Sequence, residues 1–314
     1  MKIPMRTMEM RLKDRVVGCG VQGDDCLALE VAPGKGGKYL INWSLAGKLG
    51  DEAFASRLSK KTGKKHFWVS PSEEGGLQVE SVKAIEIPEG VLSGKGGRED
   101  FFLTQIKSGF VNEEVVYGGL RMKGVGVEDG IAAKRSLHNV GGGAIKDNVN
   151  RDYAAWYSKM GIRRPHIAST ALALANAYLA MYPAEKRRAN PLRILVLKGR
   201  SVYRAVLMDG WKYIDEVVLP RMEGDDITVD VIGARMQGWV EYLNRQHPDV
   251  IDGRSIEPLV IAIRETWVSS YEHWDLWGEF AQEKIDMTGE TAEAILRNRD
   301  LAPIAFGMAL QGGC

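Results

Sequence analysis

The chain is 314 residues long, with 45% hydrophobic and 26% charged residues, a composition typical of a soluble globular protein of about two domains. Its 42 Lys and Arg residues nearly balance 41 Asp and Glu residues, so the net charge of +1 excludes a global electrostatic attraction to nucleic acid or to anionic lipid. No stretch approaches the ~18 consecutive apolar residues of a membrane-spanning helix.

The first half of the sequence predicts three short strands, then a helix and two more strands. The N-terminal residues are basic but lack an apolar segment, so we expect no secretory signal peptide. Alternating apolar residues predict strands at about 14–18, 26–32 and 38–44. Residues 44–65 predict a helix with a basic C-terminal end, which suits the helix dipole. Two further strands are expected at 66–70 and 77–87.

A glycine-rich region and an alanine-rich helix follow. Residues 98–110 predict a helix, and the glycine-dense stretch from Gly118 to Gly143 predicts loops or a hairpin. Residues 150–161 predict a helix that Gly161 ends. The alanine-rich segment 163–183 predicts a slim helix buried between larger elements.

The opening pattern then returns in the second half. Strands are predicted at 193–199, 201–210 and 211–220, and helices at 226–246, 256–271, 291–298 and 301–311. The order strand, strand, strand, helix thus occurs twice, about 180 residues apart, which is too long a period for a solenoid. We therefore predict a duplicated α/β fold with a first lobe at 1–182, an insertion at about 80–150, and a second lobe at 183–314 whose last helix packs back toward the first.

A short motif near the N-terminus tests whether the chain binds a dinucleotide. Gly18, Gly20 and Gly23 match G-x-G-x-x-G, but the fingerprint requires a helix directly after the glycines. The alternation of Leu27, Leu29 and Val31 predicts a strand instead. We interpret the glycines as a tight turn between antiparallel strands, so an NAD-binding Rossmann protein is a disfavoured alternative.

The duplication and three sequence stretches resemble the actin-like ATPase superfamily. Within it, the chain is most similar to the PilM family of type IV pilus assembly proteins, which is related to the cell-division protein FtsA. The stretches are KMGIRRPHIASTALALANAY at 159–178, RILVLKGRSVYRAVLMDGWKYIDEVV at 193–218 and FGMALQGG at 306–313. The resemblance implies an actin-like, ribonuclease H-like fold of two duplicated lobes, each a mixed sheet flanked by helices.

Two phosphate-binding hairpin turns of the superfamily are altered in this chain. The superfamily pattern is D-x-G-x-[ST] in the first lobe and D-x-G in the second, and the aspartates position Mg²⁺. Here Gly18 and Leu197 stand at the acidic positions, while Gly20 and Gly199 keep the glycines. The degenerate equivalents of the nucleotide site are Gly18, Cys19, Gly20, Lys198, Gly199, Ser201 and, on the adenosine side, Gly278.

Without these carboxylates a hard cation loses its oxygen ligands, and phosphoryl transfer needs that cation. We therefore expect no catalytic residues, no metal and no required cofactor. Lys198 and Arg200 leave weak, metal-free ATP binding open. An ATP-hydrolysing protein that uses Lys198 with Glu223 or Asp225 is the enzymatic alternative, and a filament-forming actin relative is another.

The resemblance also implies a role. PilM family members act on the cytoplasmic face of the inner membrane and hold the short N-terminal tail of the bitopic protein PilN. By resemblance, we expect the chain to be a cytoplasmic scaffold that is peripheral to the inner membrane and belongs to a type IV pilus or type II secretion-like machine. The resemblance leaves a homo-oligomer open. A PilN-like tail is expected to bind the segment at about 80–150.

Other candidate sites have little support from the sequence. Three cysteines, Cys19, Cys26 and Cys314, form no disulfide framework and suit a reducing cytoplasm. The five histidines have no metal-ligand spacing, and the glycines at 141–143 lack the Lys-Ser/Thr ending of a P-loop. The Trp-rich stretch at 267–277 predicts core packing, with a partner-binding surface as the alternative.

Overall fold

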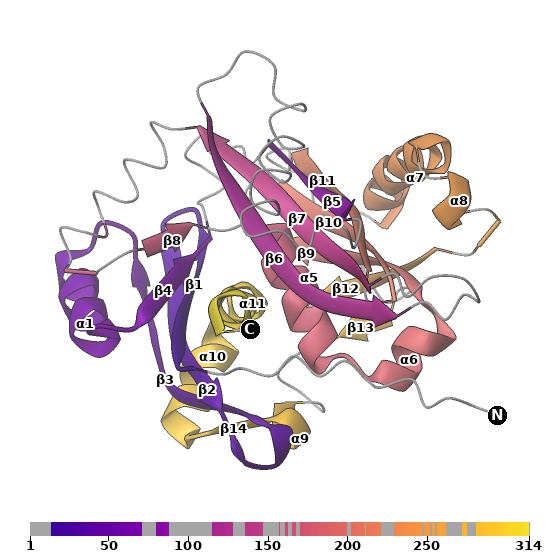
Figure 1. Ribbon diagram of the computed structural model, residues 1–314. Helices are drawn as coiled ribbons and strands as arrows, with labels where there is room; N and C mark the ends of the chain where they lie inside the picture. Colours follow the sequence, from indigo (N-terminus) through magenta and orange to yellow (C-terminus); the bar gives the residue numbers. More distant parts are fainter. Residues whose placement is uncertain are drawn as a thin grey trace.

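The computed structural model describes sixteen stretches of the chain: 14–70, 80–87, 115–127, 136–146, 157, 161–162, 165–167, 170–199, 202–210, 212–220, 229–246, 248–251, 253–254, 256–261, 272–274 and 281–313. Figure 1 shows two sheets on either side of a pair of central helices, with a third sheet beside them. Within the described stretches, no helix is both long and apolar enough to cross a membrane.

The first sheet has six strands in the order β14-β3-β2-β1-β4-β8. The strands are β1 (Val16–Gln22), β2 (Asp25–Pro33), β3 (Tyr39–Lys48), β4 (His66–Val69), β8 (Pro165–Ile167) and β14 (Ile285–Met287). β1, β2 and β3 form an antiparallel meander, whereas β4 runs parallel to β1 and β8 parallel to β4. β14 lies near the C-terminus yet pairs with β3, so the chain returns to the first sheet after it leaves the second.

The second sheet repeats this topology. Its order is β11-β10-β9-β12-β13, from β9 (Leu192–Lys198), β10 (Val202–Asp209), β11 (Lys212–Pro220), β12 (Glu257–Ile261) and β13 (Glu272–Trp274). As in the first sheet, the first three strands are antiparallel and the last two run parallel to the first. Two sheets of the same strand order and direction confirm the predicted duplication.

An outer helix covers each sheet. α1 (Glu52–Thr62) begins after Asp51, whose side chain accepts a hydrogen bond from the Ala53 amide, and it ends at Gly63, which has a φ of +57°. Its buried residues Phe54 and Leu58 are one helical turn apart and pack on the first sheet. α7 (Val229–Gln246) takes the equivalent place on the second sheet, where Trp239 and Leu243 are buried, and α8 (Pro248–Ile251) follows it.

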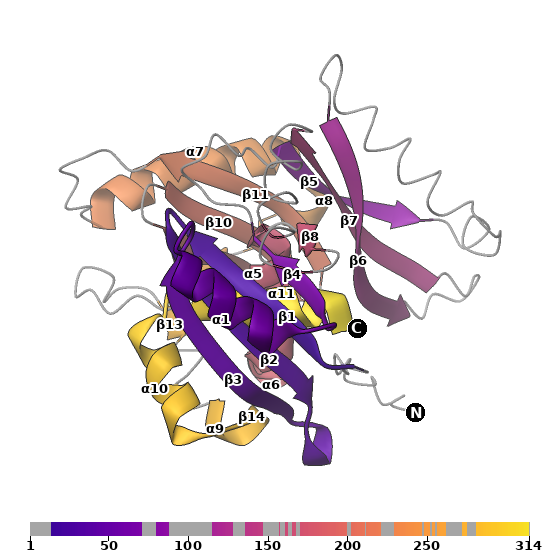
Figure 2. The same cartoon turned by 90° about the vertical axis from the view of Figure 1, so that its left-hand side faces the viewer.

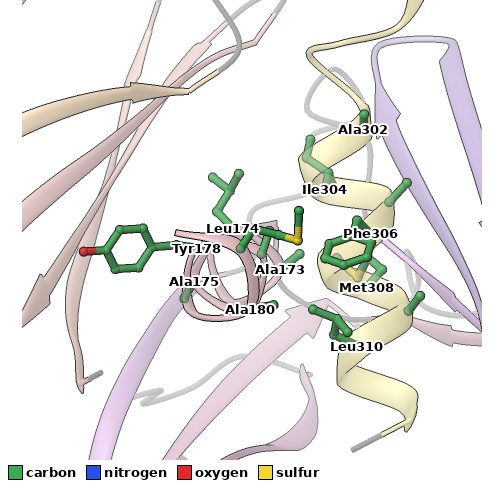
Figure 3. Packing of buried hydrophobic residues seen from close by; sticks show 14 of the residues in the cluster. Ala173, Leu174, Ala175, Tyr178, Ala180, Ala302, Ile304, Phe306, Met308 and Leu310 are labelled. Carbon is green, nitrogen blue, oxygen red and sulfur yellow. The ribbon is translucent and has the colours of Figure 1, made fainter. Parts of the chain in front are cut away.

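Two central helices lie between the sheets. α5 (Thr170–Met181) is the predicted alanine-rich crossing helix, and it is buried on almost every side. α11 (Ala302–Gly313) follows α9 (Ala281–Lys284) and α10 (Gly289–Arg297). Figure 3 shows α11 on the side of the first sheet and α5 on the side of the second, with their side chains in contact. One continuous apolar cluster therefore joins both sheets through the two helices.

The segment predicted to be an insertion contains a third sheet in the order β5-β7-β6. Its strands are β5 (Glu80–Ile87), β6 (Val115–Val127) and β7 (Ser136–Lys146), all antiparallel to their neighbours. The predicted strand at 77–87 and the predicted hairpin in the glycine-dense region are confirmed where the structure describes them. The predicted helix at 98–110 lies outside the described residues.

Several predicted boundaries were wrong. β3 extends to Lys48, into the residues assigned to a helix, and Ile167 belongs to β8 rather than to the alanine-rich helix. The helix predicted at 256–271 is contradicted at Glu257–Ile261, which forms β12. A short apolar run with the β-branched Val260 suits a parallel strand, and periodicity alone does not distinguish it from a buried helix. The remaining elements are η1 (Lys35–Gly37), in the β2–β3 turn, and α6 (Ala184–Ala189), after α5.

Candidate functional site

The turn of the first hairpin lies later in the chain than predicted. β1 continues through Gly18, Cys19 and Gly20 to Gln22, and the two turn residues are Gly23 and Asp24. Gly23 has a φ of +56°, which is the conformation expected of a glycine in a two-residue hairpin turn. The predicted tight turn between antiparallel strands is thus confirmed at Gly23, whereas Gly18 and Gly20 belong to β1, so their interpretation as turn residues was wrong.

Gly18 and Gly20 lie on the face of β1 that α11 covers. A Cβ atom on Gly18 would overlap the carbonyl oxygen of Ala305 and the amide nitrogen of Ala309. A Cβ atom on Gly20 would lie 2.8 Å from the carbonyl oxygen of Leu301. These glycines allow the backbone of a helix to approach the strand closely, which gives them a role in packing.

Cys19 points to the opposite face of β1, into the cluster under α1. It is fully buried with Phe67 and Tyr157 around it, and Cys26 on β2 lies beside it. A hydrogen bond with Cys26, together with burial, raises the pKa of the Cys19 thiol well above its usual value. The residue is thus a neutral thiol of the core rather than a nucleophile.

The end of the first hairpin is held by backbone and side-chain hydrogen bonds. The Val21 amide donates to Ser70 Oγ over 2.8 Å, and the Ser70 amide donates to the Cys19 carbonyl over 3.0 Å. Gln22 is 3% exposed, and its Nε2 has no hydrogen-bond partner among the described residues. Two exposed carboxylates, on Asp24 and Asp25, also lie at this turn, after the motif positions Gly18 and Gly20.

The second hairpin turn is where the sequence predicted it. β9 ends at Lys198, β10 begins at Val202, and the Gly199 amide donates to the Val202 carbonyl over 2.7 Å. Ser201 and Gly278, the other predicted site residues of this lobe, lie outside the described residues. The two hairpins occupy equivalent positions in the two repeated sheets, because each joins the first and second strands.

A buried ion pair lies on the inner face of the second sheet, close to its hairpin. Arg204 on β10 donates to Glu216 on β11 over 2.8 Å, and both side chains are at most 10% exposed. Arg204 alternates with Val206 and Met208, which belong to the cluster between the sheets. Within the part of the chain that the structure describes, its Nε has no hydrogen-bond partner, like the Nε2 of Gln22 at the other hairpin. A ligand that accepts hydrogen bonds would satisfy such donors.

The two central helices meet at a glycine. A Cβ atom on Gly307 of α11 would overlap the carbonyl group of Ala173 on α5. Figure 3 shows Ala173 of α5 next to Phe306 and Met308 of α11 in this contact. The same helix therefore approaches β1 closely through Gly18 and Gly20 and approaches α5 closely through its own Gly307, so no layer of large side chains separates β1, α11 and α5.

The described residues contain no group of three or more His, Cys, Asp or Glu side chains that could hold a metal ion. His66 and His166 lie side by side on β4 and β8, but the contact is between rings, with 6.1 Å between centroids, and the His166 ring stacks on Trp68 at 4.7 Å. The pair thus forms part of an aromatic contact at the edge of the first sheet.

Comparison with known proteins supports the fold. No protein-family profile and no curated protein sequence matches the chain. Among solved structures, a chain of the "PilM-PilN type IV pilus biogenesis complex" superposes with a TM-score of 0.62 at 13% identity, over 95% of this chain and 98% of that one. This protein has an actin-like fold.

Weaker structural similarities involve two other solved structures. A Bacteroides thetaiotaomicron protein with an actin-like ATPase fold superposes with a TM-score of 0.42 at 10% identity, over 91% of this chain and 96% of that one. The ethanolamine utilization protein EutJ from Carboxydothermus hydrogenoformans gives 0.37 at 9% identity, over 94% and 90%. The likeness to the PilM-PilN structure, which spans both lobes and the insertion, is the one that supports the predicted PilM-like fold.

The sequence contained a signal for the packing role of Gly18 and Gly20. Two glycines separated by one residue lie on one face of a strand, and Ala305 and Ala309 lie one turn apart on a helix. Small residues at these spacings are what a close strand–helix contact requires. The pairing could not be recognised before the return of the C-terminal segment to the first sheet was known.

Proposed function

We propose that this protein is a non-catalytic actin-fold scaffold of a type IV pilus or type II secretion-like assembly machine. It acts at the cytoplasmic face of the inner membrane and binds the N-terminal cytosolic tail of a PilN-like bitopic membrane protein. The observation that carries this proposal is the similarity to a chain of the PilM-PilN complex over 95% of the protein, which includes the insertion.

The first hairpin supports a scaffold more than an enzyme. Gly18 and Gly20, which stand in the phosphate-loop motif of the sequence, are used to pack α11. The amide of Val21 is already bonded to Ser70, so it has no free N–H for a phosphate. Phosphoryl transfer depends on preorganised donors and a cation at such a loop, and this hairpin uses its backbone to hold the core together.

The insertion offers a geometry for binding a peptide. Its sheet has β6 as an outer strand of 13 residues, and this strand pairs with β7 on one side only among the described elements. Glycines stand opposite one another in the register, Gly118 with Gly143 and Gly119 with Gly142. An extended peptide can add to an outer strand through main-chain hydrogen bonds, and glycines permit close approach of another backbone.

The proposed scaffold function is tested by measuring how tightly the protein binds fluorescently labelled tail peptides. Synthetic peptides of the cytosolic tails of bitopic proteins encoded beside this chain are titrated with the full-length protein, and anisotropy gives the Kd. We expect one tail to bind and its scrambled sequence not to bind. A Gly119→Pro variant, which removes a backbone donor from β6, is expected to weaken binding at least tenfold, whereas Gly238→Ala on α7, where an added Cβ meets nothing within 4 Å, is expected to leave the Kd unchanged. Indifference to every tail would contradict the proposal.

A second candidate function is nucleotide binding at the two hairpins. It is favoured by the unsatisfied donors Gln22 Nε2 and Arg204 Nε and by the exposed carboxylates of Asp24 and Asp25. A thermal-shift titration with ATP, with and without Mg²⁺, separates the alternatives. A ligand at about 100 times its Kd stabilises the native state by about 2.7 kcal/mol. An unchanged midpoint at millimolar ATP would exclude this candidate, and a Mg²⁺-dependent shift with phosphate release would overturn the non-catalytic assignment.

A further inference from the structure

One end of the first sheet gathers exposed cations from separate parts of the chain. Val16 pairs with Val31 and with His66, so β1 begins, β2 ends and β4 begins at this end. The β2–β3 turn lies there, and α1 ends just before β4 starts. Figures 1 and 2 show the turn at one extremity of the sheet and the last turn of α1 running toward the start of β4.

We call this surface the basic end and define it by five exposed residues: Arg15, Lys35, Lys60, Lys61 and Lys64. None of the five makes an ion pair in the described part of the structure, although Lys61 lies over the Trp43 ring, with its Nζ 5.4 Å from the ring centroid. The sequence places them at four sites, namely before β1, in the β2–β3 turn, in the last turn of α1 and after α1.

The acidic groups at this end do not neutralise the five cations. Glu30 is buried and bonded to Lys65 over 2.7 Å, and Asp286 lies 3.5 Å from Lys38, so each is matched by a further lysine. Asp14 and Glu283 are the other exposed acids of these segments. The whole chain has a net charge of only +1, so the excess of positive charge here is a local asymmetry.

The stability of α1 explains only two of the five exposed cations. Lys60 and Lys61 stand in the last turn of the helix, where cations favour the dipole. Arg15, Lys35 and Lys64 lie outside any helix of four or more residues, so the dipole gives no reason for them. A common electrostatic partner explains the five together.

The chemistry of the surface favours a lipid over a folded protein. Specific protein interfaces are built around buried aromatic or aliphatic anchors. The exposed large apolar side chains of the described residues are Val218 on β11, Tyr242 on α7 and Leu296 on α10, so none belongs to the basic end. Dispersed lysines without an apolar anchor suit a diffuse anionic surface, which attracts each basic residue by about 1 kcal/mol, or about fivefold in affinity.

We propose that the basic end rests on the anionic headgroups of a phospholipid bilayer. The proposal deepens the proposed function, on which it rests for the location at a membrane, and it gives the scaffold an orientation: the start of β1, the β2–β3 turn and the C-terminal end of α1 face the lipid. The hairpin turn at Gly23 and Asp24 lies at the opposite end of β1 and faces away from it.

Vesicle flotation with the full-length protein tests this orientation. Vesicles of phosphatidylcholine with about 30% phosphatidylglycerol are compared with pure phosphatidylcholine, each at about 0.1 M and 0.5 M salt, because screening shortens the range of charge interactions to a few ångströms at the higher value. We expect binding to the anionic vesicles alone, lost at high salt. Lys60→Glu with Lys64→Glu is expected to weaken binding at least about 25-fold, since two contributions of about fivefold are removed.

A matched variant controls for net charge. Lys48→Glu with Arg245→Glu also lowers the charge by four, and it changes exposed residues at the other end of β3 and on α7. We expect vesicle affinity within about twofold of the wild-type value. Equal loss in the two variants would overturn the proposal, and so would tighter binding to a short DNA duplex than to the anionic vesicles at the same salt.

The two proposals fail in different ways. A protein that binds a partner tail in solution but ignores anionic vesicles refutes the basic end and leaves the scaffold function standing. A protein that binds anionic vesicles through Lys60 and Lys64 but no tail refutes the scaffold function instead. Thermal unfolding of the Lys60→Glu, Lys64→Glu variant shows whether a loss of binding reflects a loss of fold, since a direct contact of these lysines with lipid leaves the midpoint unchanged while vesicle affinity falls.

Discussion

Two glycines of β1 have no room for a Cβ atom, because the backbone of α11 fills the space. An added methyl group on Gly18 would meet backbone atoms of Ala305 and Ala309, which cannot rotate away as a flexible side chain could. At this position the smallest substitution should force strand and helix apart. Gly18 is therefore important for packing, although the motif that contains it is typical of ligand binding.

Gly18→Ala is expected to destabilise the protein by about 1–3 kcal/mol, the range of overpacked cores. Urea unfolding followed by circular dichroism measures the change. Gly238→Ala on α7 is the matched control: nothing lies within 4 Å of the added Cβ, and the residue is exposed in a helix interior. There alanine should stabilise by up to about 1 kcal/mol. Equal effects at the two positions would show that α11 does not pack as closely on β1 as described.

Glu30 shows how a buried charge is retained. Burial by itself would raise its pKa, but hydrogen bonds from Lys65, Asn42 and Trp43 together outweigh burial, and the pKa lies below its usual value. Its Oε1 accepts from Asn42 over 2.6 Å, and its Oε2 accepts from Trp43 over 2.8 Å and lies 2.7 Å from the Lys65 Nζ. The network ties β2 to β3 and to the segment before β4.

The lowered pKa fixes the sign of a pH effect. The ionised form of Glu30 stabilises the fold fully above the unfolded pKa of about 4.3, and this contribution is lost as the pH falls through the lower folded-state pKa. Glu30→Gln should therefore cost about 1–3 kcal/mol at pH 7 and progressively less below about pH 4.3. The free energy of unfolding of both proteins, measured from pH 3 to pH 7, tests this. A difference independent of pH would contradict the ionised network.

At the scale of elements, α5 ends in a cluster of cations that satisfy its free carbonyl groups. Arg187 Nη1 donates to the carbonyls of Leu179 over 2.6 Å, Tyr182 over 3.0 Å and Tyr178 over 3.4 Å. Lys284 Nζ donates to the Ala180 carbonyl over 3.2 Å, from the segment that leads into β14. The C-terminal end of α5 is thus held by two cations, one from α6, which directly follows it, and one from α9, much later in the sequence.

Arg187→Ala should lower stability by about 1–3 kcal/mol, because buried carbonyls lose a charged donor. Arg188→Ala is the neighbouring control, since that side chain is exposed, and surface substitutions usually change stability by less than about 0.5 kcal/mol. Chemical denaturation compares the unfolding midpoints of the two variants. Similar midpoints would mean that Arg187 does not cap α5.

Much of this element order could be predicted from the sequence, and the exceptions have physical causes. The repeated meander and the crossing helix follow from local periodicity and glycine turns, which residues such as Leu27 and Leu29 make visible. The role of Gly18 depends on a helix that begins at Ala302, and β14 pairs with β3 across more than half the chain. Such long-range partners leave no local pattern, and the short apolar run of β12 fits a strand and a helix equally well.

For the whole molecule, the shared cluster between the sheets predicts that the lobes are not independent. Leu29 of the first sheet and Leu195 of the second belong to the same core, joined through α5 and α11. Lobes that share their apolar core should unfold together, since neither can lose its half without exposing the other. The backbones of the two central helices meet within this core at Gly307.

Gly307→Ala is therefore expected to destabilise both sheets at once, by about 1–3 kcal/mol. Hydrogen exchange followed by mass spectrometry reports protection separately for β1 and for β9, and both should lose protection by the same free energy. Trp239→Ala on α7 provides the contrast: it belongs to the outer cluster of the second sheet, so the largest local loss should lie in β9 and β10. If Gly307→Ala loosened β1 and left β9 unchanged, the lobes would be independent folding units, and the central helices would connect them without coupling their stability.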